Sequence, residues 1–319
     1  MKRRGLIAAA GLAALPAQAQ EFPRQPVRMI ATSAPGGSID VVARIVTPSM
    51  GEALGRPVLV ENRGGGGGVI AAEMVANAPP DGHVIGIFTV SAGVLNAGLY
   101  RTLRFNTRRA FAPISLINTM PMLLTVGNHV AARTLAELVA LMQARPGRLT
   151  YGSSGPGSIN HMSAHLLNTR SGTTAEHIPF RGAGPAITAM ISGDTDFLIE
   201  GIASQAPFVR QGTIRALAVT SKERSAVLPD VPTVEEAGIA DFEILNWMAL
   251  FAPVATPAPV VRRLQDATQG AVRDAATNAR LRAAGVEPVG STAAELEAFW
   301  DAQFRLWAPV VAASGVVLE

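Results

Sequence analysis

The stretch 33-SAPGGSIDVVAR-44 decides how the chain folds around it. The apolar run 27–31 before it predicts a buried strand, the two glycines predict a tight turn, and a helix is expected from residue 38. A strand, a glycine turn and a helix N-terminus together present backbone N–H groups to an anion. The stretch therefore predicts an α/β unit with an anion-binding site at its turn.

Strand-like and helix-like runs alternate along the rest of the chain, which is typical of βαβ units and parallel sheets. We expect strands at 26–31, 57–61, 83–89, 113–127, 148–152, 176–179, 195–199, 214–220 and 243–251, and helices at 38–54, 69–77, 134–144, 159–168, 185–192, 204–211, 259–283 and 292–313. The run 113–127 is long enough to cross between domains. In the second block, 152-GSSGPGSINH-161 repeats the turn and helix start of 35-PGGSID-40.

The first twenty residues, MKRRGLIAAAGLAALPAQAQ, have the features of a secretory signal peptide. Basic residues at 2–4 precede a short apolar run, and Ala17-Gln18-Ala19 matches an A-x-A cleavage site, so we expect residues 1–19 to be removed on export. The chain has 27 basic residues, and removal of the three at 2–4 leaves 24, equal to its 24 acidic residues.

Several function classes are excluded by composition and by missing motifs. No basic run with interleaved aromatics and no later apolar run of 18 residues occurs, so neither nucleic-acid binding nor a membrane span is predicted. The chain has no cysteine, which excludes disulfides, thiolate catalysis and cysteine-ligated zinc. The sequence argues against an exported serine hydrolase, because its G-x-S-x-G nucleophile elbow would need glycine where Pro156 stands. His161 and His165 have metal-ligand spacing, but Met162 replaces the glutamate of H-E-x-x-H.

What remains is two turns that each open a helix. Their free N–H groups and the hydroxyls of Ser33, Ser38, Ser153, Ser154 and Ser158 suit reversible binding of an anion, with no lysine or arginine required. Each hydrogen bond to a charged group contributes about 1.5–3 kcal/mol, so several of them reach micromolar affinity. We therefore predict a binding protein, with no enzyme activity, cofactor or metal. The alternative interpretation is that both turns are only ordinary connections between strand and helix, capped by serines.

Eight further stretches make the sequence resemble the solute-binding proteins of tripartite tricarboxylate transporters, the Bug (Bordetella uptake gene) family. They are 35-PGGSIDVVAR-44, 56-RPVLVENRGGGGG-68, 80-PDGHVIGIFT-89, 150-TYGSSGPGSINH-161, 178-IPFRGAGPAIT-188, 215-RALAVTSKERS-225, 228-LPDVPTVEEAG-238 and 252-APVATPAP-259. The resemblance implies a type II periplasmic-binding-protein fold, in which two α/β domains hold a ligand in the cleft between them. We place the domains at 20–122 with 246–319 and at 123–245.

The resemblance also implies that one carboxylate of a di- or tricarboxylate, an acidic amino acid or an aromatic acid is held by the two turns. The predicted binding residues are Ser33, Pro35, Gly36, Gly37 and Asp40 in the first turn, Thr89, Val90 and Ser91 at the cleft floor, and Gly152, Ser153, Ser154, Gly155, Gly157, Ser158 and Asn160 in the second turn. Ser38 and His161 are also predicted binding residues, because they lie next to the two turns in the sequence. We expect Asp40 to cap its helix.

The sequence departs from the family pattern at three places, and the first two of them touch the expected ligand pocket. Val90 replaces a small hydroxyl residue, Ile199-Glu200-Gly201 replaces Phe-Asp-Asn, and Asn96-Ala97 replaces Asn-Pro. Glu200 either pairs with a ligand ammonium or hydroxyl or is a solvated rim residue.

The resemblance implies delivery of the ligand to the membrane subunits of a tripartite transporter. We expect a periplasmic monomer. An alternative is a periplasmic sensor that presents its closed form to a signalling receptor, which the sequence does not distinguish from transport.

Overall fold

The computed structural model describes residues 22–33, 35, 37–180 and 182–319, so the expected signal peptide and Gly36 lie outside the described residues. The described strands form one mixed sheet in the order β2-β1-β3-β9-β4-β7-β5-β6, with β8 and β10 also paired to β4. The strands are β1 (Val27–Ala31), β2 (Val58–Asn62), β3 (Val84–Phe88), β4 (Phe111–Gly127), β5 (Thr150–Ser153), β6 (Glu176–Pro179), β7 (Phe197–Gly201), β8 (Ile214–Val219), β9 (Leu245–Pro253) and β10 (Glu287–Pro288).

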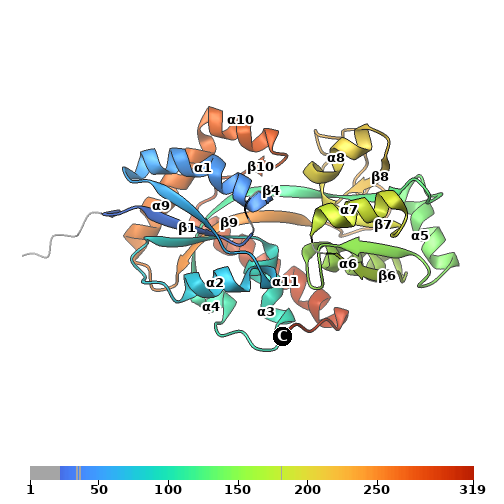
Figure 1. Cartoon of the computed structure of the whole chain (residues 1–319), viewed down its shortest axis with the longest axis horizontal. Helices are drawn as coiled ribbons and strands as arrows, with labels where there is room; N and C mark the ends of the chain where they lie inside the picture. The colour runs from blue at the N-terminus through green and yellow to red at the C-terminus, as the bar shows by residue number, and fades with distance from the viewer. Residues whose placement is uncertain (1–21, 34, 36, 181) are drawn as a thin grey trace, which may run out of the picture.

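Two strands, β4 and β9, join the two lobes that are visible in Figure 1. Residues 111–121 of β4 pair with β9, and residues 122–127 pair with β7 and β8 in the second lobe. The 17-residue strand is apolar along nearly its whole length and is buried in both lobes, as the sequence predicted for a crossing segment. The domain limits near residues 122 and 246 stay a prediction, placed close to this change of partners.

Helices cover both faces of the sheet in each lobe (Figure 1). The helices are α1 (Ser38–Leu54), α2 (Val69–Ala76), α3 (Asn96–Leu99), α4 (Thr107–Ala110), α5 (Leu135–Ala144), α6 (Ile159–Ser171), α7 (Ala183–Ser192), α8 (Ile202–Arg210), α9 (Ala258–Arg273), α10 (Ala275–Ala283) and α11 (Ala293–Ser314), with a 3-10 turn η1 (Gly66–Gly68) and a π-helical turn η2 (Ser91–Leu95). Helix α1 packs against α9 and α10, while α11 packs on the opposite face with η2 and α3.

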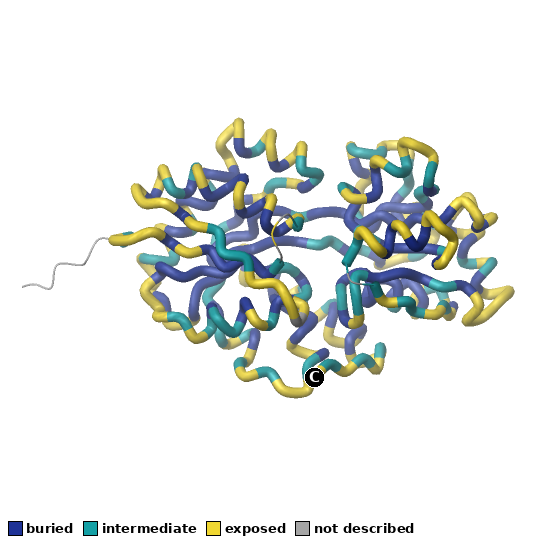
Figure 2. The backbone as a smooth tube through the Cα atoms, in the orientation of Figure 1, coloured by how far each residue is buried: buried dark blue, intermediate teal, exposed yellow. Residues whose placement is uncertain are grey.

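One hydrophobic cluster is continuous across both lobes. It contains Phe88, Trp247 and Trp300 in the first lobe and Tyr151 and Phe197 in the second, all of them buried. Figure 2 shows the buried backbone following the strands through the junction. The two lobes therefore share buried side chains along β4 and β9, and the ends of the other strands face one another beside this junction.

The structure corrects two sequence predictions. The expected helix 259–283 is two helices, because the Asp274 side chain accepts a hydrogen bond from the Thr277 N–H at 2.9 Å and starts α10. The sheet is mixed, because β4 and β9 run antiparallel to their main partners. The helix expected at 38–54 is confirmed residue for residue by α1.

Candidate functional site

The carboxyl ends of two sets of parallel strands face one another across the junction. Strands β1, β2 and β3 are parallel and end at Ala31, Asn62 and Phe88. Strands β5, β6 and β7 are also parallel, and they end at Ser153, Pro179 and Gly201. The carboxyl edge of a parallel sheet is where α/β proteins bind ligands, because the loops that follow the strands open helices there.

The register along β4 gives the separation of these two edges. Phe88 pairs with Ala249, which pairs with Leu116 of β4, whereas Gly201 pairs with Met122 of the same strand. Six residues of extended chain span about 20 Å. The loops after each strand border this interval from both sides, so the two predicted turns lie at its opposite edges.

The first turn connects β1 to α1 and keeps a free hydroxyl group. Thr32 Oγ1 donates to the Ile87 carbonyl at 3.2 Å, which fixes the start of the turn on β3. Ser33 Oγ is buried and has no hydrogen-bond partner among the described residues. Gly37, with φ −73° and ψ 166°, precedes the first residue of α1 and brings no side chain to the helix N-terminus.

Around this turn the remaining predicted residues differ in accessibility. Pro35 and Ser38 are exposed, while Asp40 is buried in the first turn of α1 and accepts a hydrogen bond from Arg44 Nε at 2.9 Å. Thr89 and Ser91 are partly buried at the end of β3. Val90 is fully buried in the hydrophobic cluster, so only its backbone is available to a ligand.

The second turn connects β5 to α6, and its hydroxyl groups bond within the protein. Ser153 Oγ lies 2.6 Å from His177 Nε2 and 3.1 Å from both the carbonyl oxygen and the amide nitrogen of Gly155. Ser158 caps α6: its Oγ donates to the Gly155 carbonyl at 2.7 Å and accepts the His161 N–H. Ser154 Oγ donates to Asn160 Oδ1. The donors left for a ligand here are backbone N–H groups at the start of α6.

Two stacked imidazoles contact the residues of the second turn. The rings of His161 and His177 lie 3.7 Å apart, and the Gly157 N–H donates to His161 Nδ1 at 3.2 Å. Burial, together with the neighbouring His177 and His165 imidazoles, lowers the pKa of His161 to about 3, and burial lowers the pKa of His177 to about 4. Both rings are therefore neutral near pH 7, so His161 Nδ1 is unprotonated and can accept the hydrogen bond from the Gly157 N–H. Sequence reasoning missed His177, because it lies 24 residues from Ser153 on the adjacent strand.

Ser154, Asn160 and Glu200 form a row joined by hydrogen bonds, and Glu200 is its last member. The side chain of Glu200 is half-buried, its Oε2 accepts from Asn160 Nδ2 at 2.8 Å, and its Oε1 accepts from the Gly201 N–H at 2.7 Å. The surrounding protein removes water from this carboxyl group and raises its pKa to about 7, although both hydrogen bonds oppose the rise. Gln205, which sequence reasoning also missed, is fully buried and donates to the Glu200 and Leu123 carbonyls at 3.1 and 2.7 Å.

The structure thus brings the second-turn residues, Asn160, His161 and Glu200 into one hydrogen-bonded and stacked group. The first-turn residues and Thr89–Ser91 lie at the opposite strand edge. Gly157 also touches the first lobe, since a Cβ at this position would lie 2.8 Å from Leu99 Cδ1 of α3.

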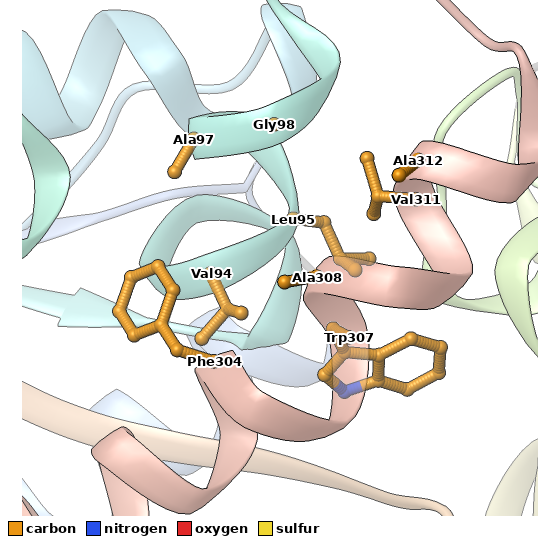
Figure 3. A pocket seen from close by; sticks show the side chains of 9 residues that line it. All are labelled: Val94, Leu95, Ala97, Gly98, Phe304, Trp307, Ala308, Val311 and Ala312. Atoms are coloured by element: carbon orange, nitrogen blue, oxygen red, sulfur yellow. The ribbon is translucent and has the colours of Figure 1, made fainter.

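A separate apolar pocket of about 240 Å³ lies between η2, α3 and α11 (Figure 3). Its lining consists of Val94, Leu95, Ala97, Gly98, Phe304, Trp307, Ala308, Val311 and Ala312. Trp307 Nε1, the one side-chain nitrogen drawn there, lies 3.3 Å from Gln303 Oε1. No described residue of the two turns lines this pocket, and it offers no charge to an anion.

Neither a metal-binding cluster nor a membrane-spanning helix is found among the described residues. No group of three or more histidine, cysteine, aspartate or glutamate side chains is placed to hold a metal ion. No described helix is both long and apolar enough to cross a membrane. Two lobes joined by crossing strands, with facing glycine turns, define a solute-binding protein of the periplasmic-binding-protein type.

Comparison with known proteins identifies the family. Residues 42–316 match the TctC family, described as the tripartite tricarboxylate transporter family receptor, and the chain belongs to it. Protein BugT of Bordetella pertussis is 32% identical over 98% of this chain and 96% of its own length. This confirms the resemblance to Bug proteins and identifies the chain as a receptor of a binding-protein family.

Solved structures agree with the sequence comparison. A Rhodopseudomonas palustris protein, MatC, solved with bound malate, has a TM-score of 0.80 and 32% identity, covering 91% of this chain and all of its own. An R. palustris protein solved with adipate has a TM-score of 0.83 and 29% identity, covering 93% of this chain and 99% of its own. The expected fold class is thereby confirmed.

Proposed function

We propose that this protein captures a small carboxylate between its two lobes and delivers it to the membrane subunits of a tripartite tricarboxylate-type transporter. The observation that carries the proposal is the pair of parallel-strand edges that face one another, each with a glycine- and serine-rich turn opening a helix. Both helix N-termini contribute N–H donors and a partial positive charge to the same interval.

The donors that face this interval suit a carboxylate group. Ser33 Oγ in the first turn is buried without a partner among the described residues, and the first N–H groups of α1 and α6 have no partners within their helices. A helix terminus contributes about 0.3–2 kcal/mol to a carboxylate, and each charge-assisted hydrogen bond about 1.5–3 kcal/mol. Four or five such contacts, reduced by the entropy cost of association, give micromolar affinity.

Relatives support the ligand class. MatC is solved with malate and a second relative with adipate, and both ligands are dicarboxylates. The family description, a receptor of tripartite tricarboxylate transporters, supports delivery to membrane subunits and a periplasmic location. Closure of the two lobes is then a shift of population toward the ligand-bound form, and it is worth only what the ligand gains in that form.

Thermal unfolding of residues 20–319 against a panel of acids tests the proposal. The panel contains succinate, malate, adipate, citrate, aspartate, glutamate, benzoate and nicotinate, with the matching amides as controls. A ligand at about 100 times its Kd stabilises the protein by roughly 2.7 kcal/mol and raises the unfolding midpoint by several degrees. We expect a rise with at least one acid and none with its amide.

Two glycine variants locate the binding site. Gly37→Val places a side chain at the N-terminus of α1 in backbone geometry that any residue adopts, so the protein should fold but lose the ligand-induced rise. Gly270→Val is the matched control, since it lies on α9 in open space, away from both strand edges. Binding that survives Gly37→Val unchanged would remove the first turn from the site. No rise with any acid in the unaltered protein would contradict the ligand class.

A further inference from the structure

The row Ser154, Asn160 and Glu200 has a fixed direction of hydrogen bonding. The Ile199 carbonyl can only accept, so the atom of Asn160 that faces it at 2.9 Å must be Nδ2. The second hydrogen of Nδ2 is donated to Glu200 Oε2 at 2.8 Å. Asn160 Oδ1 therefore faces Ser154, whose hydroxyl donates to it. Every side-chain donor of this row is used inside the protein.

While Glu200 is ionised, the side chains of the row offer a ligand acceptor capacity only. An ionised carboxylate has about four lone-pair positions, and the described contacts occupy two of them on Glu200. Ser154 Oγ and Asn160 Oδ1 keep lone pairs as well. Asn160 is buried and cannot turn away, but Glu200 is half-buried and accessible.

No positive charge among the described residues balances Glu200. Its two contacts are an amide and a backbone N–H, and the nearby rings of His161 and His177, on α6 and β6, are neutral. A second ligand carboxylate placed here would meet another acid and, among the described side chains of the row, no free donor, which is unfavourable in a partly desolvated site. A ligand hydroxyl or ammonium would complete the bonding.

We propose that Ser154, Asn160 and Glu200 form a subsite for a hydrogen-bond donor of the ligand, so that the protein selects hydroxy or amino carboxylates over unsubstituted acids of the same chain length. This inference rests on the proposed function, which supplies the carboxylate held by the two turns. The subsite assigns Glu200 to ligand selection, one of the two roles that the sequence left open.

Calorimetric titration of matched ligands tests the subsite. Succinate is compared with malate and with aspartate, and adipate is compared with 6-aminohexanoate, on unaltered protein, on Glu200→Gln and on Glu176→Gln. Glu176 is an exposed glutamate at the far end of β6 and serves as the control. We expect the unaltered protein and Glu176→Gln to bind at least one donor-bearing ligand about tenfold or more tightly than its unsubstituted partner, as one charge-assisted hydrogen bond implies.

Glu200→Gln should bring that ratio close to one while keeping or improving affinity for the unsubstituted acid, because the amide offers a donor where the carboxylate repelled a second acid. A ratio unchanged by Glu200→Gln, or no preference in the unaltered protein, would overturn the subsite and leave carboxylate capture intact. Failure of every acid to bind would overturn the proposed function and the subsite with it. Circular dichroism of each variant checks that loss of binding is not loss of fold.

Discussion

Glu200 should make the stability of the protein depend on pH in a direction opposite to most carboxylates. Its pKa is raised from an ordinary 4.5 to about 7 by the loss of water around a half-buried group. A carboxyl group with a raised pKa in the folded protein contributes stability that is fully present below about pH 4.5. That contribution is lost as the pH rises through about 7.

The size of this effect follows from the distance between the two pKa values. Each pH unit of separation corresponds to about 1.4 kcal/mol, so ionisation of Glu200 costs the folded state about 3 kcal/mol. Glu200→Gln removes this cost at high pH and changes nothing through ionisation at low pH. Its stability relative to the unaltered protein should therefore improve by about 3 kcal/mol between about pH 4 and about pH 8.5.

Urea denaturation at several pH values measures that difference directly, and subtraction of the two curves cancels the titration of all other groups. Glu61→Gln is the control of opposite sign, because the hydrogen bond from Arg28 lowers the pKa of Glu61. Its relative stability should stay level above about pH 5 and change only in acid. A Glu200→Gln difference that is flat across the whole range would refute the claim that the junction desolvates Glu200.

Three further predictions concern the second turn and the shared core. Gly157 has φ +73°, and a Cβ there would lie 2.8 Å from Leu99 Cδ1, whereas Gly147 has φ +68° and open space around it. Both Gly157→Ala and Gly147→Ala should cost about 1–2 kcal/mol of backbone strain, and Gly157→Ala should lower the free energy of unfolding further because of the contact with Leu99. Urea denaturation compares the two variants. The lowered pKa values of His161 and His177 should make stability fall as the pH drops from about 6.5 to about 4, because the unfolded chain takes up protons that the folded protein refuses, and His177→Gln should reduce that slope in denaturation curves. Trp300→Phe removes the indole bond to the Gly93 carbonyl at 2.7 Å and leaves a void, so a loss of about 2–4 kcal/mol is expected in calorimetry, and a loss below about 1 kcal/mol would contradict the packing.

Local sequence signals predicted the elements of this fold well, because each strand and helix has its own pattern of apolar residues. The start of α1 at Ser38 and the crossing strand β4 follow from such patterns. The break between α9 and α10 also had a local signal, the Asp274 cap, which the continuous apolar spacing concealed. The mixed sheet had none, since strand order depends on contacts between distant segments.

The candidate site was predictable only in its chain positions. Sequence motifs indicated both turns, but no local pattern links Ser153 to His177 or Asn160 to Glu200. These pairs form because β5, β6 and β7 lie side by side with their carboxyl ends at one edge. Val90 illustrates the reverse case: its place in the chain suggested the cleft floor, but its apolar side chain is buried in the shared core.

The two turns look equivalent in sequence, but their hydrogen bonds divide the work of recognition between them. In the first turn, Ser33 Oγ has no partner among the described residues and the N-cap residue of α1 is Gly37, so on the proposed function this turn donates to a negative charge. The second turn uses its hydroxyls on its own backbone, on His177 and on Asn160, and it ends in the acceptors of Glu200. A ligand with one carboxylate and one donor satisfies both edges at once, whereas a ligand with two carboxylates satisfies the second edge only when Glu200 holds a proton. If the two turns hold the ligand as proposed, this asymmetry ties ligand choice to a single ionisable group at the junction.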